Sequence, residues 1–406
     1  MNSPQASHRR SHSVPIHSLG ISQIIAYGLL FYVFALLKTP LAQLYSVSET
    51  YILILLSIII GLQALLAPVF GYWADRFSAV LVMVFGLICG GAGLMMLGAG
   101  HHILFLYAGF VLIGLGVGGA TYELAFAAAV QLDEQQSRKN ISYITFYGAV
   151  ASSLSWLIVG QMLSLFSLHF TLVLCGLTAW SMAGRMAWLS AQTAAQHRGH
   201  QAAFERFRFS QLEASEKAAM VLLAIAGGAG YLGFGAASMM WISWFDSLYA
   251  NTALAVVLAS IYGPFQLVGR VLEMRYGSRF DARLTGAVAS VAVPAGVCLA
   301  QFDMVLVSLV AMALFGMGQG VITVTTGFVA NLYFRAEIYG RAKGWISLPK
   351  TLGLACGPLA GGLLYTILGE MFLWAIMGLT LITSLSFFAL LRHKPTNHLH
   401  EILSQR

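Results

Sequence analysis

The sequence predicts an all-α membrane protein whose twelve spanning helices form two six-helix bundles. Composition is the first reason: 58% of the 406 residues are hydrophobic and only 9% are charged, whereas about a quarter of the residues in a soluble domain are charged. The second reason is that the apolar residues gather in runs long enough to cross a hydrocarbon core of about 30 Å, which takes about 20 helical residues. One long polar connection, 192–215, divides these runs into six and six.

The expected spans are joined by short polar connections. The first apolar run is longer than the core of a cleavable signal peptide, so we expect it to remain as a spanning helix. Polar cytoplasmic tails are expected at 1–18 and 392–406, and the bundles at 19–191 and 216–391. The individual spans are expected at 19–44, 50–73, 79–99, 103–131, 141–164, 168–191, 216–238, 250–276, 281–300, 304–330, 344–366 and 370–391.

The distribution of basic residues predicts the orientation in the membrane. Cytoplasmic loops carry an excess of Lys and Arg. With the N-terminus inside, all but two of the 22 Lys and Arg residues fall in or beside cytoplasmic segments. The exceptions are Lys38, near the outer end of the first span, and Lys350, inside the eleventh. We therefore expect a protein of the cell inner membrane with both termini in the cytoplasm.

Two patterns repeat between the halves. A short polar turn between the second and third spans reads Gly71-x-x-x-Asp75-Arg76, and Gly269-x-x-x-Glu273 in the eighth span repeats its glycine and acid at an offset of 198 residues. The fourth and tenth spans share a Gly-x-Gly-x-Gly motif, a threonine and a phenylalanine at a constant offset of 202 residues. Such repeats are typical of two related bundles about an axis normal to the membrane. The alternative is that glycines recur only because they help helices to pack.

The first of these patterns resembles the major facilitator superfamily. Gly71-x-x-x-Asp75-Arg76 is similar to that family's loop between helices 2 and 3, although residues 78–80 lack the glycine and two basic residues that follow there. The resemblance implies two six-helix bundles that work by alternating access. It also implies that the loops that switch conformation contain Gly71, Asp75, Arg76, Gly269 and Glu273.

Within that superfamily, the eighth span resembles the monocarboxylate-porter group and its bacterial relatives. Those porters have Asp-x-x-x-Arg there, with the arginine facing the substrate carboxylate and the aspartate handling a proton. This chain has Gln266-x-x-x-Arg270. The resemblance therefore implies carboxylate binding by Arg270 and leaves proton handling at Gln266 open. Lys38 aligns loosely with a lysine that the group has near the outer end of helix 1.

Four ionisable residues in the spans are candidates for substrate binding or ion coupling, because a charge in hydrocarbon is costly unless it is paired or faces water. Glu123, Arg270, Glu273 and Lys350 all lie at similar depth on the cytoplasmic side. The alternatives are that Lys350 extends to the interface and that Glu273 belongs only to the loop motif. We expect Glu123 and Lys350, which belong to opposite bundles, to pair when the inner side is closed. A pair of Glu123 with Arg270 is the competing arrangement.

Two further residues are weaker candidates for a substrate cavity. The glycine-rich stretch 227–235 of the seventh span is expected either to be broken and to line the cavity, with Tyr231 as a contact surface, or to pack closely. Gln319 in the tenth span is a candidate because it is polar in an apolar run, although a packed interface is the default for such a residue.

The sequence offers little for other kinds of chemistry. We find no nucleophile with its base, no metal-ligand frame and no P-loop, so we expect neither an enzyme nor a cofactor or metal. The basic residues are dispersed, so no nucleic-acid partner is expected. The four cysteines lie far apart in apolar runs, where we expect them to be small buried residues.

The expected function is secondary active transport of a small organic solute, in particular an anion such as a carboxylate, with protons as the coupling ion in a symporter. The expected partners are that solute, protons and the lipid bilayer, and the expected state is a monomer. Efflux of a cationic or neutral toxicant or drug on the same fold is one alternative. A non-transporting membrane sensor is an alternative from another class.

The orientation is open to a direct test. A reporter that is active only outside the cytoplasm should work when fused at Ser167 or Asp303 and fail at Gln136 or Gly199. The reason is that the first two positions are expected in outer loops and the other two in cytoplasmic segments. Activity in the opposite pattern would reverse the orientation and the depth of every candidate residue.

Overall fold

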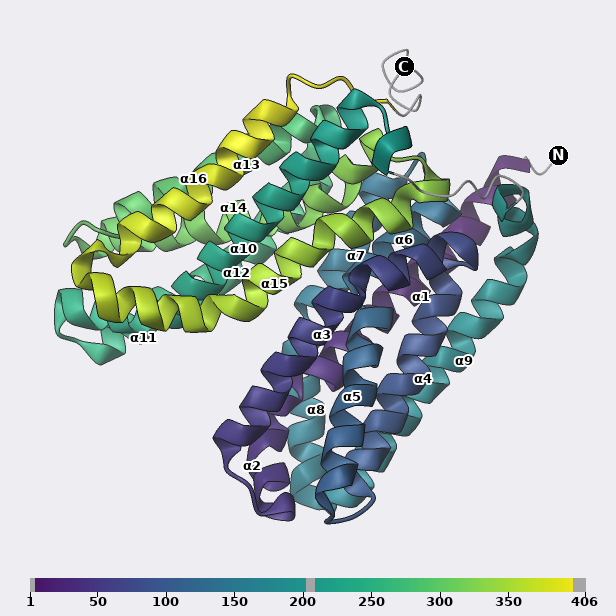
Figure 1. Cartoon of the computed structure of the whole chain (residues 1–406), viewed down its shortest axis with the longest axis horizontal. Helices are drawn as coiled ribbons and strands as arrows, with labels where there is room; N and C mark the ends of the chain where they lie inside the picture. The colour runs from purple at the N-terminus through teal and green to yellow at the C-terminus, as the bar shows by residue number, and fades with distance from the viewer. Residues whose placement is uncertain (1–3, 202–208, 397–406) are drawn as a thin grey trace. The chain divides into compact units, whose positions relative to one another are not determined.

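The computed structural model describes residues 4–201 and 209–396, which are helical apart from short connections (Figure 1). They separate into two compact units: unit 1 is Met1–Arg206 with Ala336–Gly344, and unit 2 is Phe207–Arg335 with Trp345–Arg406. Helix α15 contributes to both, because its first nine residues belong to unit 1 and the rest to unit 2.

Unit 1 contains the first six predicted spans, and three of them are interrupted. The first contains a π-helical turn, η1, and bends by 47° there; such turns are a common cause of kinks. The fourth is interrupted at Thr121 and the fifth at Val150. The helices are α1 (Pro4–Tyr27), η1 (Gly28–Tyr32), α2 (Phe34–Tyr45), α3 (Glu49–Arg76), α4 (Ala79–Gly98), α5 (Ile103–Ala120), α6 (Tyr122–Leu132), α7 (Ser137–Ala149), α8 (Ala151–Leu165) and α9 (Leu168–Gln201).

Unit 2 contains the other six spans. The eighth breaks at Ile261, just before Pro264, whose ring would clash with the carbonyl group four residues earlier in a continuous helix. The helices are η2 (Phe209–Gln211), α10 (Ala214–Tyr249), α11 (Thr252–Ser260), α12 (Tyr262–Tyr276), η3 (Gly277–Arg279), α13 (Ala282–Leu299), α14 (Val305–Tyr333), α15 (Ala336–Leu368), η4 (Gly369–Met371) and α16 (Phe372–Leu390).

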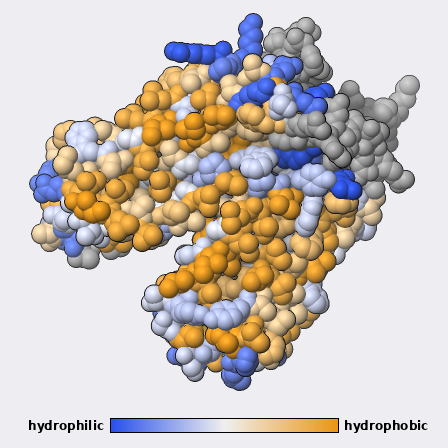
Figure 2. All heavy atoms as spheres, in the orientation of Figure 1, coloured by the Kyte–Doolittle hydropathy of each residue, from blue (hydrophilic) through white to orange (hydrophobic). Residues whose placement is uncertain are grey.

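The described helices confirm the all-α membrane-spanning fold class. Nine helical stretches within the described residues are long and apolar enough to cross a membrane, or ten if the bent first pair counts as one span. One of these stretches, Ala336–Leu390, holds both α15 and α16, and the interrupted fifth span adds α7 with α8. A helix or a pair of helices therefore lies over each of the twelve predicted spans. Large apolar side chains remain exposed along them (Figure 2), as contact with hydrocarbon requires.

Several helices extend beyond the predicted ends of the spans. Helix α1 begins at Pro4, inside the predicted tail, and α3 continues to Arg76, so that the turn before α4 shrinks to Phe77 and Ser78. Helix α9 continues into the predicted central connection, and α15 begins eight residues before 344. Hydropathy marks where the hydrocarbon ends and not where the helix ends. Residues 202–208 of the central connection and 397–406 of the C-terminal tail lie outside the described residues.

The repeated glycine motif makes equivalent contacts in the two units. In α5, the first and third glycines of 114–118 pack on α3 and the middle one packs on α4. In α14, the first and third glycines of 316–320 pack on α12 and the middle one packs on α13. Helices α3 and α12 are the second spans of their halves, and α4 and α13 are the third. The equivalence favours two related bundles over chance recurrence of packing glycines.

Close packing also explains the glycine-rich seventh span. Helix α10 is continuous through its glycines, and a Cβ atom at Gly235 would lie 3.1 Å from Gly357 of α15. A Cβ at Gly353 of α15 would lie 2.5 Å from the carbonyl oxygen of Gly228. The two helices therefore approach each other through glycines, as small residues allow in membrane proteins, and the prediction of a broken helix is wrong.

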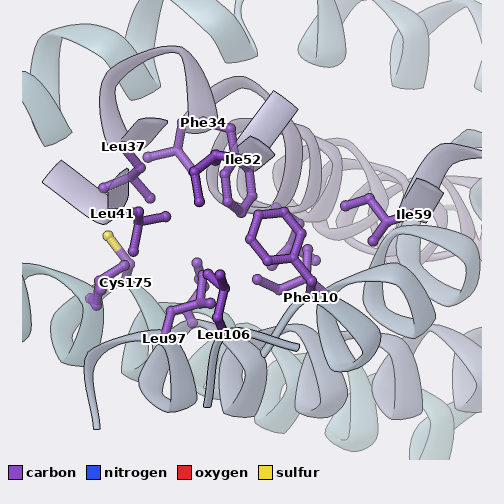
Figure 3. Packing of buried hydrophobic residues seen from close by; sticks show 14 of the residues in the cluster. Phe34, Leu37, Leu41, Ile52, Ile59, Leu97, Leu106, Phe110 and Cys175 are labelled. Atoms are coloured by element: carbon purple, nitrogen blue, oxygen red, sulfur yellow. The ribbon is translucent and has the colours of Figure 1, made fainter. Parts of the chain in front are cut away.

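An apolar core of unit 1 draws buried side chains from all six of its spans, most of them from the first and the fourth (Figure 3). The rings of Phe34 and Phe110 pack with their centroids 5.2 Å apart. Leu37, Leu41 and Ile52 are fully buried around them. This core fixes one end of the bundle. The buried charges described below lie on other segments of α3, α6 and α15.

Candidate functional site

Asp75 fastens the start of α15 to the last turn of α3 within unit 1. Its fully buried carboxylate accepts hydrogen bonds from the backbone N–H groups of Gly340 (2.7 Å) and Arg341 (2.9 Å). It also accepts one from Nε of Arg341 at 2.8 Å, and that side chain is only 5% exposed. Gly71 and Gly340 make the approach possible, because a Cβ atom on either would collide with the facing helix.

A second buried ion pair joins α6 to α15. Nζ of Lys343 lies 3.3 Å from Oε2 of Glu123, and the two side chains are 2% and 13% exposed. The same ammonium lies 6.0 Å from the centre of the Phe126 ring, where the face of an aromatic ring attracts a cation. A lysine buried this deeply in apolar surroundings requires a compensating partner to stay charged.

The break in the fourth span positions Glu123. Thr121 has an extended backbone, and its hydroxyl donates to the carbonyl oxygen of Val117 at 2.7 Å, a local bond that competes with the helix. Helix α6 then begins at Tyr122, which places Glu123 in its first turn. The N–H groups of a first turn favour a negative charge. The interruption therefore stabilises the carboxylate that Lys343 contacts.

Aromatic rings of α1 and α6 adjoin this pair. The Tyr122 ring stacks on Phe126 with centroids 5.3 Å apart, and it lies 4.6 Å from the ring of Tyr27. Tyr27 ends α1 at the π-helical turn, and Tyr32 on the far side of that turn lies 6.1 Å from it. A paired charge beside a series of rings can receive a solute that has both an ionic and an apolar part.

Three predicted candidates lie together in unit 2. Nζ of Lys350 in α15 is 4.9 Å from the centre of the Tyr231 ring in α10. The Tyr231 hydroxyl hydrogen-bonds Oγ1 of Thr323 at 3.2 Å, and that threonine donates to the carbonyl oxygen of Gln319 at 2.8 Å. Because Thr323 is already a donor, the tyrosine hydroxyl is the donor in its own bond. Lys350, Tyr231 and Gln319 thus form one contiguous group across α15, α10 and α14.

The predicted pair on the eighth span occupies one face of α12. Gln266 and Arg270 are four residues apart, so their side chains project from the same side of the helix, and both are half-buried. Gly269 packs against the backbone of Met317 in α14. Glu273 is 6% exposed, and its carboxylate lies against Gly277.

Two other predicted residues make local contacts. Lys38 forms an ion pair with Glu49 at 3.2 Å, with side chains 38% and 43% exposed, which joins α2 to the start of α3. Arg76 donates to the Tyr72 hydroxyl at 3.0 Å and lies over the Phe77 ring. Within 4–201 and 209–396, no group of three or more His, Cys, Asp or Glu residues could hold a metal ion.

The sequence did not predict Arg341 or Lys343 as site residues. Both were assigned to a cytoplasmic loop before a span starting at 344, whereas they lie in α15 and are 4% and 1% exposed. One feature of the sequence could have indicated that Lys343 belongs to the helix: Lys343 and Lys350 are seven residues apart and therefore share one helix face. Glu123 has Lys343 as its partner in the structure. The pairing of Glu123 with Lys350, which belong to different units, stays a prediction.

The Glu123–Lys343 pair should show strong coupling in a double-mutant cycle. Glu123→Gln and Lys343→Met should each lower the free energy of unfolding by about 3–5 kcal/mol, because each leaves a buried charge without its partner. The double variant should recover most of that loss. The matched control is the exposed pair Lys38–Glu49, where the same substitutions should change stability by less than about 1 kcal/mol. Additive losses for Glu123 and Lys343 in detergent unfolding experiments would refute the pairing.

Comparison with known proteins identifies the fold. No family model and no curated protein matches this chain. Solved structures do match. A bacterial homologue of the iron transporter ferroportin superposes with a TM-score of 0.73 at 13% identity, covering 93% of this chain and 99% of that chain. The proton:xylose symporter XylE superposes with a TM-score of 0.68 at 14% identity, covering 96% of this chain and 99% of XylE. The human organic anion transporter MFSD10 superposes with a TM-score of 0.68 at 15% identity, covering 96% of this chain and 100% of MFSD10. The chain therefore has the twelve-helix fold of the major facilitator superfamily.

Proposed function

We propose that this protein is a secondary active transporter of the major facilitator superfamily that moves a small organic solute by alternating access. The buried Glu123–Lys343 pair is the observation that carries the proposal. Buried opposite charges in a membrane bundle are costly, and apolar residues of similar volume often serve stability as well or better. A pair of this kind is therefore better explained by the movement of charge than by folding alone.

The proposed substrate is an anion such as a carboxylate. Arg270, Lys343 and Lys350 are basic residues within spanning helices, and each is partly or fully buried. The similarity of the eighth span to monocarboxylate porters supports carboxylate binding by Arg270, and Lys350 beside Tyr231 offers an ammonium next to an aromatic ring. One structural neighbour, MFSD10, is an organic anion transporter. XylE is a proton:xylose symporter, and another neighbour is a homologue of the iron transporter ferroportin, so the fold alone does not determine the substrate.

Coupling to protons follows from the chemistry of the pair. A proton on Glu123 neutralises its carboxylate and leaves Lys343 in need of another anion. The negative charge of a bound substrate anion can then compensate that ammonium, so that one proton and one monoanion bind together without adding net charge. Gln266, which stands where the porters have an aspartate, is then not required for coupling.

The proposed switch is the contact between α3 and α15. Asp75 fixes Arg341 and Gly340 at the start of α15, so any movement of this segment away from α3 must break these bonds. Gly269 and Glu273 occupy the corresponding positions in the second half. We place this switch on the cytoplasmic side, in a monomer of the inner membrane with both termini inside.

The rings near Glu123 favour a second candidate function. Tyr27, Tyr122 and Phe126 form an aromatic surface beside a carboxylate, which suits the efflux of a cationic or neutral toxicant. The nearby ammonium of Lys343 opposes a cation. A non-transporting sensor would show no solute flux at all.

A solute screen in proteoliposomes distinguishes these functions. Purified protein is reconstituted, a pH gradient is imposed, and uptake of monocarboxylates, neutral sugars and lipophilic cations is measured. We expect carboxylate uptake that depends on the gradient. Cation movement without carboxylate uptake would support the toxicant transporter instead, and no flux of any solute would support the sensor.

The guanidinium group of Arg270, and not only its positive charge, should be essential for carboxylate transport. Arg270→Lys should lower transport by roughly tenfold to a hundredfold, because an ammonium cannot reproduce the two parallel hydrogen bonds of a guanidinium. Arg392→Lys, an exposed position after α16 in the same unit, is the matched control and should leave transport unchanged. Near wild-type uptake by Arg270→Lys would remove Arg270 from the substrate site.

A further inference from the structure

Unit 2 has an apolar hollow to which the proposed function gives no role, although Gly269 and Glu273 of the proposed switch are part of its lining. Its volume is about 460 Å³, and it lies between α12, η3, α13 and α14. That volume is within the range of pockets that hold small ligands, about 300–1,000 Å³. Its walls include the exposed side chains of Leu272, Phe280, Leu284 and Val288. These residues lie on membrane-spanning segments or directly beside them, so the hollow opens toward lipid.

Small residues create the hollow. Helices α12 and α13 each pack on α14. Gly269 of α12 packs against the backbone of Met317, and Gly318 of α14 packs against Ala289 of α13. The hollow lies over α14 between the two neighbouring helices, and Ala292 forms part of its wall. The lining is almost entirely apolar, so a polar solute would find few hydrogen-bond partners there.

Two exposed arginines stand close in sequence to Tyr276 and Gly277, which line the hollow. Arg275 is in the last turn of α12 and Arg279 is in η3, and both are exposed. The guanidinium of Arg279 lies 5.5 Å from the ring centre of Tyr276, which lines the hollow. Asp281 pairs with Arg283 at 2.6 Å. One acid, the buried Glu273, is part of the lining, where its carboxylate lies against Gly277.

We propose that the hollow is a binding site for an anionic phospholipid. One acyl chain fills the apolar space, and the phosphate is held by Arg275 and Arg279 at the end of the spanning helices, where lipid headgroups lie. Guanidinium groups match phosphate geometry, and basic pockets between spanning helices are known to suit anionic headgroups. An apolar hollow with a basic rim fits this amphipathic anion better than a soluble ligand.

Native mass spectrometry tests the proposal. Full-length protein in detergent is mixed with phosphatidylglycerol or phosphatidylcholine of the same acyl chains, and retained lipids are counted. We expect one phosphatidylglycerol to be retained in preference to phosphatidylcholine. Arg275→Gln with Arg279→Gln should lower that preference by about fivefold per arginine. Ala292→Phe should reduce the retention of both lipids by filling the space for the chain.

Two controls separate the site from general attraction. Lys139→Gln removes an exposed cation that lies 5.9 Å from a tyrosine ring in unit 1, and it should leave retention unchanged. Val288→Trp narrows the hollow at a position that is 62% exposed, so it tests occupancy even if Ala292→Phe does not fold. The proposal is overturned if Lys139→Gln lowers the preference as much as the arginine variants. It is also overturned if Val288→Trp retains phosphatidylglycerol like the wild type.

Discussion

A charge buried among membrane-spanning helices must have a partner, and in this protein α15 brings two such charges into unit 1. Arg341 and Lys343 are almost completely buried; Arg341 contacts Asp75 at 2.8 Å, and Lys343 contacts Glu123 at 3.3 Å. Much of the surrounding structure follows from this requirement. Gly71 lacks a side chain so that α3 can reach the backbone of α15. The fourth span breaks at Thr121, so that Glu123 stands at a helix start.

The two acids differ in how firmly they are held, and this difference suits different roles. Asp75 accepts two backbone hydrogen bonds as well as the arginine bond, so its carboxyl group is held in one position, although burial raises its pKa to about 7. Glu123 faces a lysine, whose flexible point charge can exchange one anion for another more readily than a guanidinium fork. We therefore propose that Asp75 makes the conformational contact and that Glu123 couples proton and substrate.

The sequence predicted the fold because hydropathy and repetition report it directly. The apolar runs gave the spans, and the glycines of 114–118 and 316–320 proved to make equivalent contacts in the two units. The site was predicted only in part. Hydropathy assigned Lys343 to a loop, since a polar helix end looks like the end of a span. The breaks at Thr121 and Val150 depend on tertiary contacts and local bonds that a single sequence does not reveal.

The binding of a carboxylate to purified protein as a function of pH tests the central proposal most directly. If a proton on Glu123 releases Lys343 for the substrate, wild-type affinity should fall by up to about tenfold per pH unit above the range in which Glu123 titrates. Glu123→Gln imitates the protonated state and should bind the same carboxylate with an affinity that does not change with pH. A pH dependence that survives in Glu123→Gln would contradict the assignment of coupling to this pair.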